Sequence, residues 1–117
     1  MRDHTKLRAY ELADELVILI YKITKDFPKE EMYGLISQMR RAAVSIPSNI
    51  VEGCARNSRT ELVRFLDIAF GSLRELNYQY SLAERLGYIK SNEKVNCQIN
   101  LIETEKVLSS LIRKIRN

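Results

Sequence analysis

The segment LISQMRRAAVSIPSNIVEGC, residues 35–54, decides the fold class. Its apolar residues recur at steps of three and four, which places them on one face of an α-helix: Leu35, Met39, Ala42, Ala43, Ile46, Ile50 and Cys54. The stripe keeps its phase through Pro47. The pattern therefore predicts one amphipathic helix that is kinked at Pro47, where the hydrogen bond to the Ala43 carbonyl is lost. Two shorter helices that meet at Ile46 and Pro47 are the alternative.

The same segment begins a second, partly apolar stripe on another face of the helix. A helix in a bundle needs one apolar face, so a second one suggests a further packing partner. Arg40, Val44, Val51 and Ala55 follow one another at spacings of 4, 7 and 4, away from the first face. Phe70 likewise points away from the inward face of the next predicted helix. Since apolar surface left over from a bundle favours association, Val44, Val51, Ala55 and Phe70 are candidate residues of an oligomer interface.

The rest of the chain predicts three more amphipathic helices. One runs from Lys6 to Phe27, one from Ser58 to about Leu86, and one from Ser91 to the C-terminus. Their inward faces carry, in chain order, Ala9, Leu12, Ala13, Leu16, Leu19, Ile20 and Ile23; Leu62, Phe65, Ala69, Ser72, Leu73, Leu76, Tyr80 and Ala83; and Cys97, Leu101, Thr104, Leu108, Leu111 and Ile115. We expect four further residues to widen the last of these faces: Val95, Ile99, Ile102 and Ile112.

Local signals mark where these helices begin. Pro28 and the charged residues 29–31 suit the first turn of the second helix. Ser58 and Glu61 have the spacing of a capping box at the start of the third. Ser91 is the expected cap of the fourth.

Glycines and short polar stretches mark where the helices end. Gly53 and Asn57 are expected to bracket the turn between the second and third helices, and Gly87 suits a left-handed cap of the third. No strand pattern competes with the helices. The chain is therefore predicted to be a single all-α domain, residues 1–117, folded as an antiparallel up-down-up-down four-helix bundle.

Composition agrees with a globular cytoplasmic protein. Of the 117 residues, 45% are hydrophobic and 29% are charged, which is far from the composition of a disordered chain. No window approaches the roughly 20 apolar residues that a membrane helix needs. Residues 1–6 lack the apolar segment of a secretory signal, so we expect the cytoplasm and no membrane association.

The residue types needed for catalysis are missing or isolated. The one histidine, His4, lies in the N-terminal segment, far in sequence from any candidate nucleophile. Cys54 and Cys97 lack the paired spacing of zinc ligands and are expected to be small core residues. No E-x-x-H motif or glycine-rich phosphate loop occurs. We therefore expect no enzymatic activity, no metal and no cofactor.

Arginines around the second and third helices are the candidate nucleic-acid contacts. The chain has 19 basic and 15 acidic residues, a net charge of +4, which permits an anionic partner. Guanidinium groups bind phosphates bidentately, and the candidates are Arg40, Arg41, Arg56, Arg59 and Arg64. Alternatively they pair with Glu52, Glu61, Asp67 or helix-end carbonyls. A helix-turn-helix reader is disfavoured because the two helices are long and antiparallel.

The second and third predicted helices also carry a recognisable motif. It reads RRAAVSIPSNIVEG from Arg40 to Gly53, followed by a pattern in residues 56–75 that includes Arg56, Ser58 and the run FLxIAxGSxxE. This sequence resembles the four-helix bundle family of ribosomal intervening-sequence proteins, which are encoded in insertions of bacterial large-subunit ribosomal RNA genes and by free-standing genes. The resemblance extends from Tyr10 onward, although many members have tryptophan at that position.

The resemblance implies a homopentameric ring and a loosely defined function. A related accessory protein of retroelements binds nucleic acid and a reverse transcriptase, which implies nucleic-acid contact by the matching residues Arg40, Arg41, Arg56 and Arg59. Our hypothesis is a non-enzymatic oligomer that binds RNA or DNA, or associates with the ribosome, through basic side chains. The alternative is a scaffold or accessory subunit that binds another protein.

Overall fold

The computed structural model describes residues 2–90 and 92–117. Within these residues every regular element is a helix, and there is no strand. Its elements are, in order, the 3-10 helix η1 (His4–Lys6), α1 (Arg8–Thr24), the 3-10 helix η2 (Lys29–Glu31), α2 (Leu35–Cys54), α3 (Arg59–Arg85) and α4 (Lys94–Arg116). None of these helices is both long enough and apolar enough to span a membrane.

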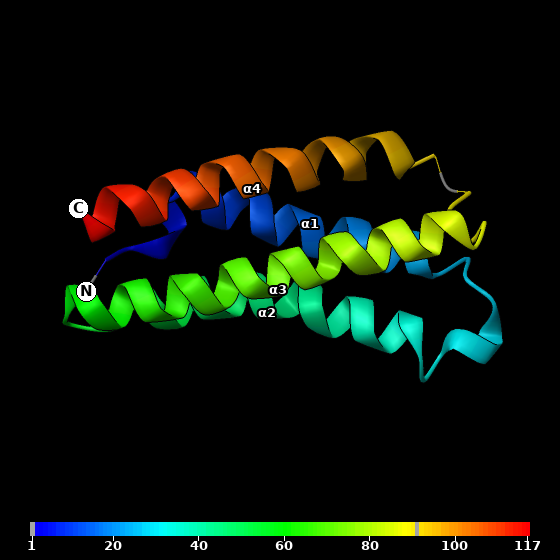
Figure 1. Ribbon diagram of the computed structural model, residues 1–117, viewed down its shortest axis with the longest axis horizontal. Helices are drawn as coiled ribbons and strands as arrows, with labels where there is room; N and C mark the ends of the chain where they lie inside the picture. Colours follow the sequence, from blue (N-terminus) through cyan, green and yellow to red (C-terminus); the bar gives the residue numbers. More distant parts are fainter. Residues whose placement is uncertain (1, 91) are drawn as a thin grey trace.

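The four α-helices pack as a bundle 43 Å long and 25 by 20 Å across. α1 contacts α2 and α4, and α3 contacts the same two helices. Successive helices run back and forth along the long axis, so the α2–α3 turn lies at the same end as both termini (Figure 1). The predicted all-α four-helix bundle is confirmed.

α2 runs unbroken from Leu35 to Cys54 with Pro47 inside it. The interpretation as two shorter helices is therefore wrong, whereas the kink at Pro47 stays a prediction. Gly53, expected to border the turn, is instead buried within this helix. The turn to α3 is thus confined to residues 55–58.

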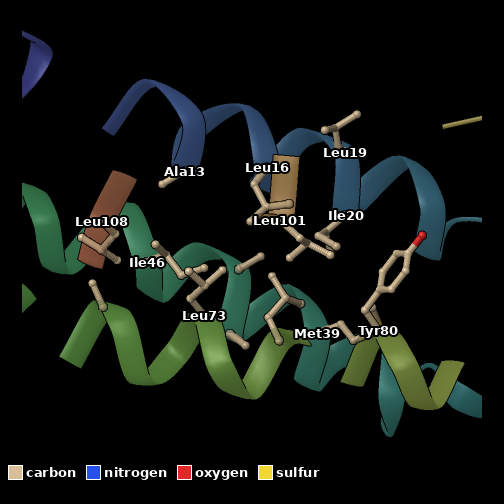
Figure 2. Close-up of a cluster of buried hydrophobic side chains, with 14 of the residues drawn as sticks. Ala13, Leu16, Leu19, Ile20, Met39, Ile46, Leu73, Tyr80, Leu101 and Leu108 are labelled. Atoms are coloured by element: carbon tan, nitrogen blue, oxygen red, sulfur yellow. The ribbon is translucent and has the colours of Figure 1, made fainter. Parts of the chain in front are cut away.

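The predicted stripes form the core. Side chains from all four helices meet between them, including Leu16 of α1, Met39 of α2, Leu73 of α3 and Leu108 of α4 (Figure 2). Every residue of the predicted α1 face and of the first α2 stripe is buried. Ser72 and Leu111 are only half-buried.

The prediction of a widened inward face on α4 is wrong for three of its four residues. Val95, Ile99 and Ile102 are exposed, although Ile112 is buried as expected. They lie at i, i+4 and i+7 and form a separate stripe, beside the seam that α4 presents to α1 and α3. Because the seam of α4 faces the core, this exposed α4 stripe lies on the outside of the bundle.

A buried polar pair joins α4 to α1. The Asn100 side-chain amide donates to the Leu12 carbonyl oxygen over 3.1 Å, and the Thr104 hydroxyl donates to Asn100 Oδ1 over 2.7 Å. Because both side chains are buried, these bonds supply partners that water cannot. The sequence predicted Thr104 in the seam but did not predict Asn100.

The predicted helix ends agree in part with the structure. The Ser58 hydroxyl accepts a hydrogen bond from the Glu61 amide over 3.0 Å, and Gly87 has φ +77° as a left-handed cap requires. The expected α2 start at Pro28 is wrong, because residues 29–31 form η2 and α2 begins at Leu35. There the Glu31 carboxylate accepts from the Leu35 amide over 3.1 Å. The predicted cap Ser91 lies outside the described residues.

Two glycines test how closely α2 and α3 approach. A Cβ atom on Gly53 would lie 2.9 Å from Phe65 Cβ, whereas one on Gly71 meets nothing within 4 Å. Gly53→Ala is therefore expected to lower the free energy of unfolding by about 1–3 kcal/mol. Gly71→Ala should raise it by about 0.5–1 kcal/mol, because alanine favours the helix.

Urea denaturation of both variants beside the wild type measures these changes. The two variants add the same methyl group, so each serves as the control for the other. A Gly53→Ala protein as stable as the wild type would show that α2 and α3 are not in close contact at this point.

Candidate nucleic-acid interface

The five candidate arginines occupy two surfaces, not one. Arg40 and Arg41 lie in the first half of α2, beside the end of α1, whereas Arg56, Arg59 and Arg64 lie around the α2–α3 turn. The helix between Arg41 and Cys54 is about 20 Å long at 1.5 Å per residue. A nucleic acid that contacts both surfaces of one chain must span that distance.

Near the turn, the guanidinium groups of Arg56 and Arg64 both pack against the Phe65 ring. Their guanidinium carbons lie 4.9 and 5.2 Å from the Phe65 ring centroid. Arg56 also pairs with Glu52 at 3.1 Å, and Arg64 with Glu61 at 3.8 Å. For these two arginines the alternative of internal pairing therefore holds, although such exposed pairs are weak.

Arg59, the first residue of α3, is exposed, and its side chain makes no hydrogen bond or ion pair within residues 2–90 and 92–117. It shares a shallow depression with Thr60, Val63 and Arg116. Asp67, a possible partner in the alternative interpretation, pairs with Arg116 instead. Arg59 thus keeps its guanidinium group available to an external anion.

Arg40 is held in place by the end of α1. Its Nε donates over 2.9 Å to the hydroxyl of Thr24, which is fully buried and itself donates to the Ile20 carbonyl oxygen over 2.8 Å. The guanidinium carbon lies 4.5 Å from the centroid of the Tyr21 ring. These contacts fix the Arg40 group against α1, as a cation–π pair with Tyr21.

Next to this pair, a groove of about 620 Å³ runs between α1, the segment after η2, and α2. Its lining includes Tyr21, Tyr33, Arg40, Arg41 and Val44. Tyr33 is 95% exposed and Tyr21 42% exposed. The Arg41 side chain makes no hydrogen bond or ion pair in the part of the chain that the structure describes, so the groove joins aromatic rings to a free guanidinium group.

The sequence analysis missed Tyr21 and Tyr33. The two tyrosines belong to different elements and share no periodic spacing, so nothing in the sequence groups them. Only the packing of α1 against α2 brings them to Arg40 and Arg41.

A second groove, of about 520 Å³, lies between α1 and α4 and has a different character. Three carboxylates line it, those of Glu15, Glu93 and Glu103, against the two cations Arg8 and Lys22. A polyanion is repelled by such a lining. The α1–α2 groove, which no carboxylate lines, suits it better.

The four candidate residues of the oligomer interface do not form one surface either. Val44 and Val51 lie on the outer face of α2 and Ala55 directly follows its end, and all three are exposed or half-buried. Phe70 instead packs partly against the core, on the side of α3 that faces α4. That placement follows from Arg74 and Asn77, four and seven residues further on, which both bond to Glu105 of α4. Phe70 therefore does not extend the α2 face.

Comparison with known proteins identifies the family. The family model described as 23S rRNA-intervening sequence protein matches residues 5–110. The chain belongs to this family. The match covers both arginine surfaces and the α1–α2 groove, and it confirms the resemblance seen in the sequence.

A solved structure is similar along most of the intervening-sequence protein. It is the crystal structure of a protein of unknown function from the S23 ribosomal protein family of Bacteroides thetaiotaomicron, which is 25% identical to this chain. The alignment covers 90% of this chain and 95% of that one, with a TM-score of 0.79. Comparison with curated proteins finds no match.

The thiols of this family member are core groups. Cys54 and Cys97 are both buried, and burial raises the pKa of the Cys54 thiol and raises that of Cys97 to about 12. Among the described residues, no group of three or more His, Cys, Asp or Glu side chains is placed to hold a metal ion.

We expect neither cysteine to react with a disulfide reagent such as dithionitrobenzoate at pH 8 while the protein is folded. The thiolate is the reacting form, and burial both excludes the reagent and disfavours ionisation. In guanidinium chloride, both thiols should react at once, which provides the control. Reaction of either thiol within minutes in the native protein would contradict the buried positions.

Proposed function

We propose that this intervening-sequence protein is a non-enzymatic, cytoplasmic oligomer that binds nucleic acid, most favourably RNA, through unpaired arginines. The observation that carries the proposal is the position of Arg41 and Arg59, which are exposed and whose side chains make no hydrogen bond or ion pair within the described residues. A buried or paired guanidinium group would have to break a contact before it bound a phosphate, and these two do not. The family description, which refers to 23S rRNA, supports RNA as the ligand.

Oligomerisation is the second part of the proposal. The outer face of α2 carries Val44, Val51 and Ala55 at the surface of the single chain, and a second copy would cover it. The family resemblance favours a pentamer, in which five chains of charge +4 give +20. Repeated weak phosphate contacts around such a ring add up to useful avidity if the nucleic acid spans several subunits.

Removal of the two free arginines should weaken RNA binding. The variant Arg41→Gln/Arg59→Gln is expected to bind a labelled RNA more weakly than the wild type, and its affinity should depend less steeply on salt because fewer counterions are released. The control, Arg74→Gln/Arg116→Gln, removes the same charge from arginines that are paired with Glu105 and Asp67. Titration by fluorescence anisotropy at two salt concentrations separates the two variants.

Equal losses in the test and control variants would mean that net charge alone, not these positions, governs binding. Absence of RNA binding by the wild type even at low salt would contradict the proposal. It would favour the alternative, a scaffold or accessory subunit that contacts another protein.

The α2 face has its own test. Val51→Glu places a charge in the proposed contact between copies and should reduce the mass in solution to that of a monomer. Ile102→Glu is the matched control, because Ile102 is exposed on α4, away from this face. Sedimentation measures the mass, and circular dichroism checks that the helices persist. A monomeric mass for the wild type at micromolar concentration would refute the assembly.

A further inference from the structure

We infer that the groove between α1 and α2 holds an unpaired nucleotide of a single strand, with its base against the aromatic lining and its phosphate on Arg41. This inference rests on the proposed function and names the form of nucleic acid that the site takes. Four features of the groove carry it: a fixed cation–π pair, an exposed ring, the absence of carboxylates from the lining, and its size.

The first feature is the pair formed by Arg40 and Tyr21. Thr24 holds the Arg40 Nε at 2.9 Å, and the guanidinium carbon lies 4.5 Å from the Tyr21 centroid. Both residues line the groove. Guanidinium planes and aromatic rings are the surfaces on which proteins stack unpaired bases, and this pair is ordered before a ligand arrives.

The second feature is Tyr33, whose side chain is almost completely exposed at 95%. Three other apolar side chains around the same groove are exposed as well, those of Tyr21, Met32 and Val44. The α1–α4 groove, by contrast, is lined by no tyrosine. An aromatic ring in water is available to stack on a base, and every base has a face that it can use.

The third feature is the charge of the lining. The only ionic side chains that line the groove are Arg40 and Arg41. The nearest carboxylate along the chain from Tyr33, that of Glu31, accepts hydrogen bonds from the Leu35 amide and from the Tyr88 hydroxyl over 3.1 and 3.0 Å. The nucleotide's phosphate therefore meets the unpaired Arg41 without an opposing acid in the lining.

The fourth feature is the size of the groove, which suits one unpaired nucleotide and not a paired base within a duplex. At about 620 Å³ the groove falls in the range of small-ligand sites, roughly 300–1,000 Å³. Bases inside a duplex are stacked and paired, so their faces cannot reach Tyr33 or Tyr21. A single strand presents those faces and binds by stacking, with little dependence on sequence.

The groove and the proposed contact between copies meet only at Val44. Val51 and Ala55 lie further along α2, toward its C-terminal end and the turn to α3. Val51 is about 10 Å from Val44 along the helix axis. A second copy that covers Val44, Val51 and Ala55 thus meets the groove at one edge, whereas Tyr33 lies in the segment before α2, outside the proposed contact residues.

Titrations with three labelled probes test the inference: oligouridine of about 16 nucleotides, oligothymidine of the same length, and an RNA duplex of the same length. Tyr33→Leu keeps an apolar side chain but removes the ring, and it should weaken binding of both single strands by about 5- to 100-fold while binding of the duplex is unchanged. The matched control Tyr33→Phe keeps the ring and should bind like the wild type. Arg41→Gln should weaken all three probes.

The outcomes separate this inference from the proposed function. If Tyr33→Leu binds the single strands as the wild type does while Arg41→Gln binds them more weakly, the inference is overturned and the proposed function stands. If the wild type binds none of the three probes, both are overturned. A lower mass in solution for Tyr33→Leu would show that the groove is a contact between copies. If Tyr33→Leu weakened oligouridine but not oligothymidine, the contact would depend on the ribose hydroxyl or the missing methyl group and not on stacking. Either result overturns the inference.

Discussion

The structure depends on one constraint: each of four helices must bury an apolar face between two neighbours. The α1 stripe and the first α2 stripe are buried, and the largest fully buried side chains, such as Ile20, Met39, Leu73 and Leu108, come from all four helices. Burial of one such side chain is worth about 1.5–3 kcal/mol, so the sum over all stripes selects the arrangement that hides them together. The other features of the chain occupy the surface that this arrangement leaves outside.

The same packing prepares the candidate site. Thr24 belongs to the buried face of α1, and its hydroxyl reaches the Arg40 side chain of α2 because the two helices lie side by side. A buried hydroxyl needs its hydrogen bonds, and here the Ile20 carbonyl oxygen and the Arg40 Nε satisfy it. Arg40 therefore has a structural role, whereas the side chain of its neighbour Arg41 makes no hydrogen bond or ion pair within residues 2–90 and 92–117 and is exposed to solvent. Of these two adjacent arginines, packing therefore holds only Arg40 in place.

Periodicity predicted the fold well, because residues at steps of three and four share a face whatever lies opposite. It found the α1 and α2 faces, and the caps at Ser58 and Gly87 follow from local backbone chemistry. It could not choose between competing stripes on one helix. Val95 and its companions on α4 have the same spacing as the true seam, but the bundle has no neighbour on their side.

The candidate site was predictable only in part, for a related reason. The sequence shows which arginines exist, but their partners depend on which helices are neighbours. Arg56 and Arg64 meet carboxylates of their own segment, which the spacing allows, whereas the groove joins Tyr21 and Tyr33 across elements. The sequence could not predict that Phe70 faces α4 either, because a helical wheel gives the direction of a side chain but not the helix that lies in that direction.

The central claim is that a nucleic-acid strand contacts the α1–α2 groove. Photochemical crosslinking tests it most directly: the wild-type protein is bound to oligouridine that contains a photoreactive thiouridine, irradiated and digested, and the linked peptides are sequenced by mass spectrometry. The account predicts links to Tyr21 or Tyr33, lost when unlabelled oligouridine competes. Links confined to α4 or to the α1–α4 groove, with none at these tyrosines, would contradict it.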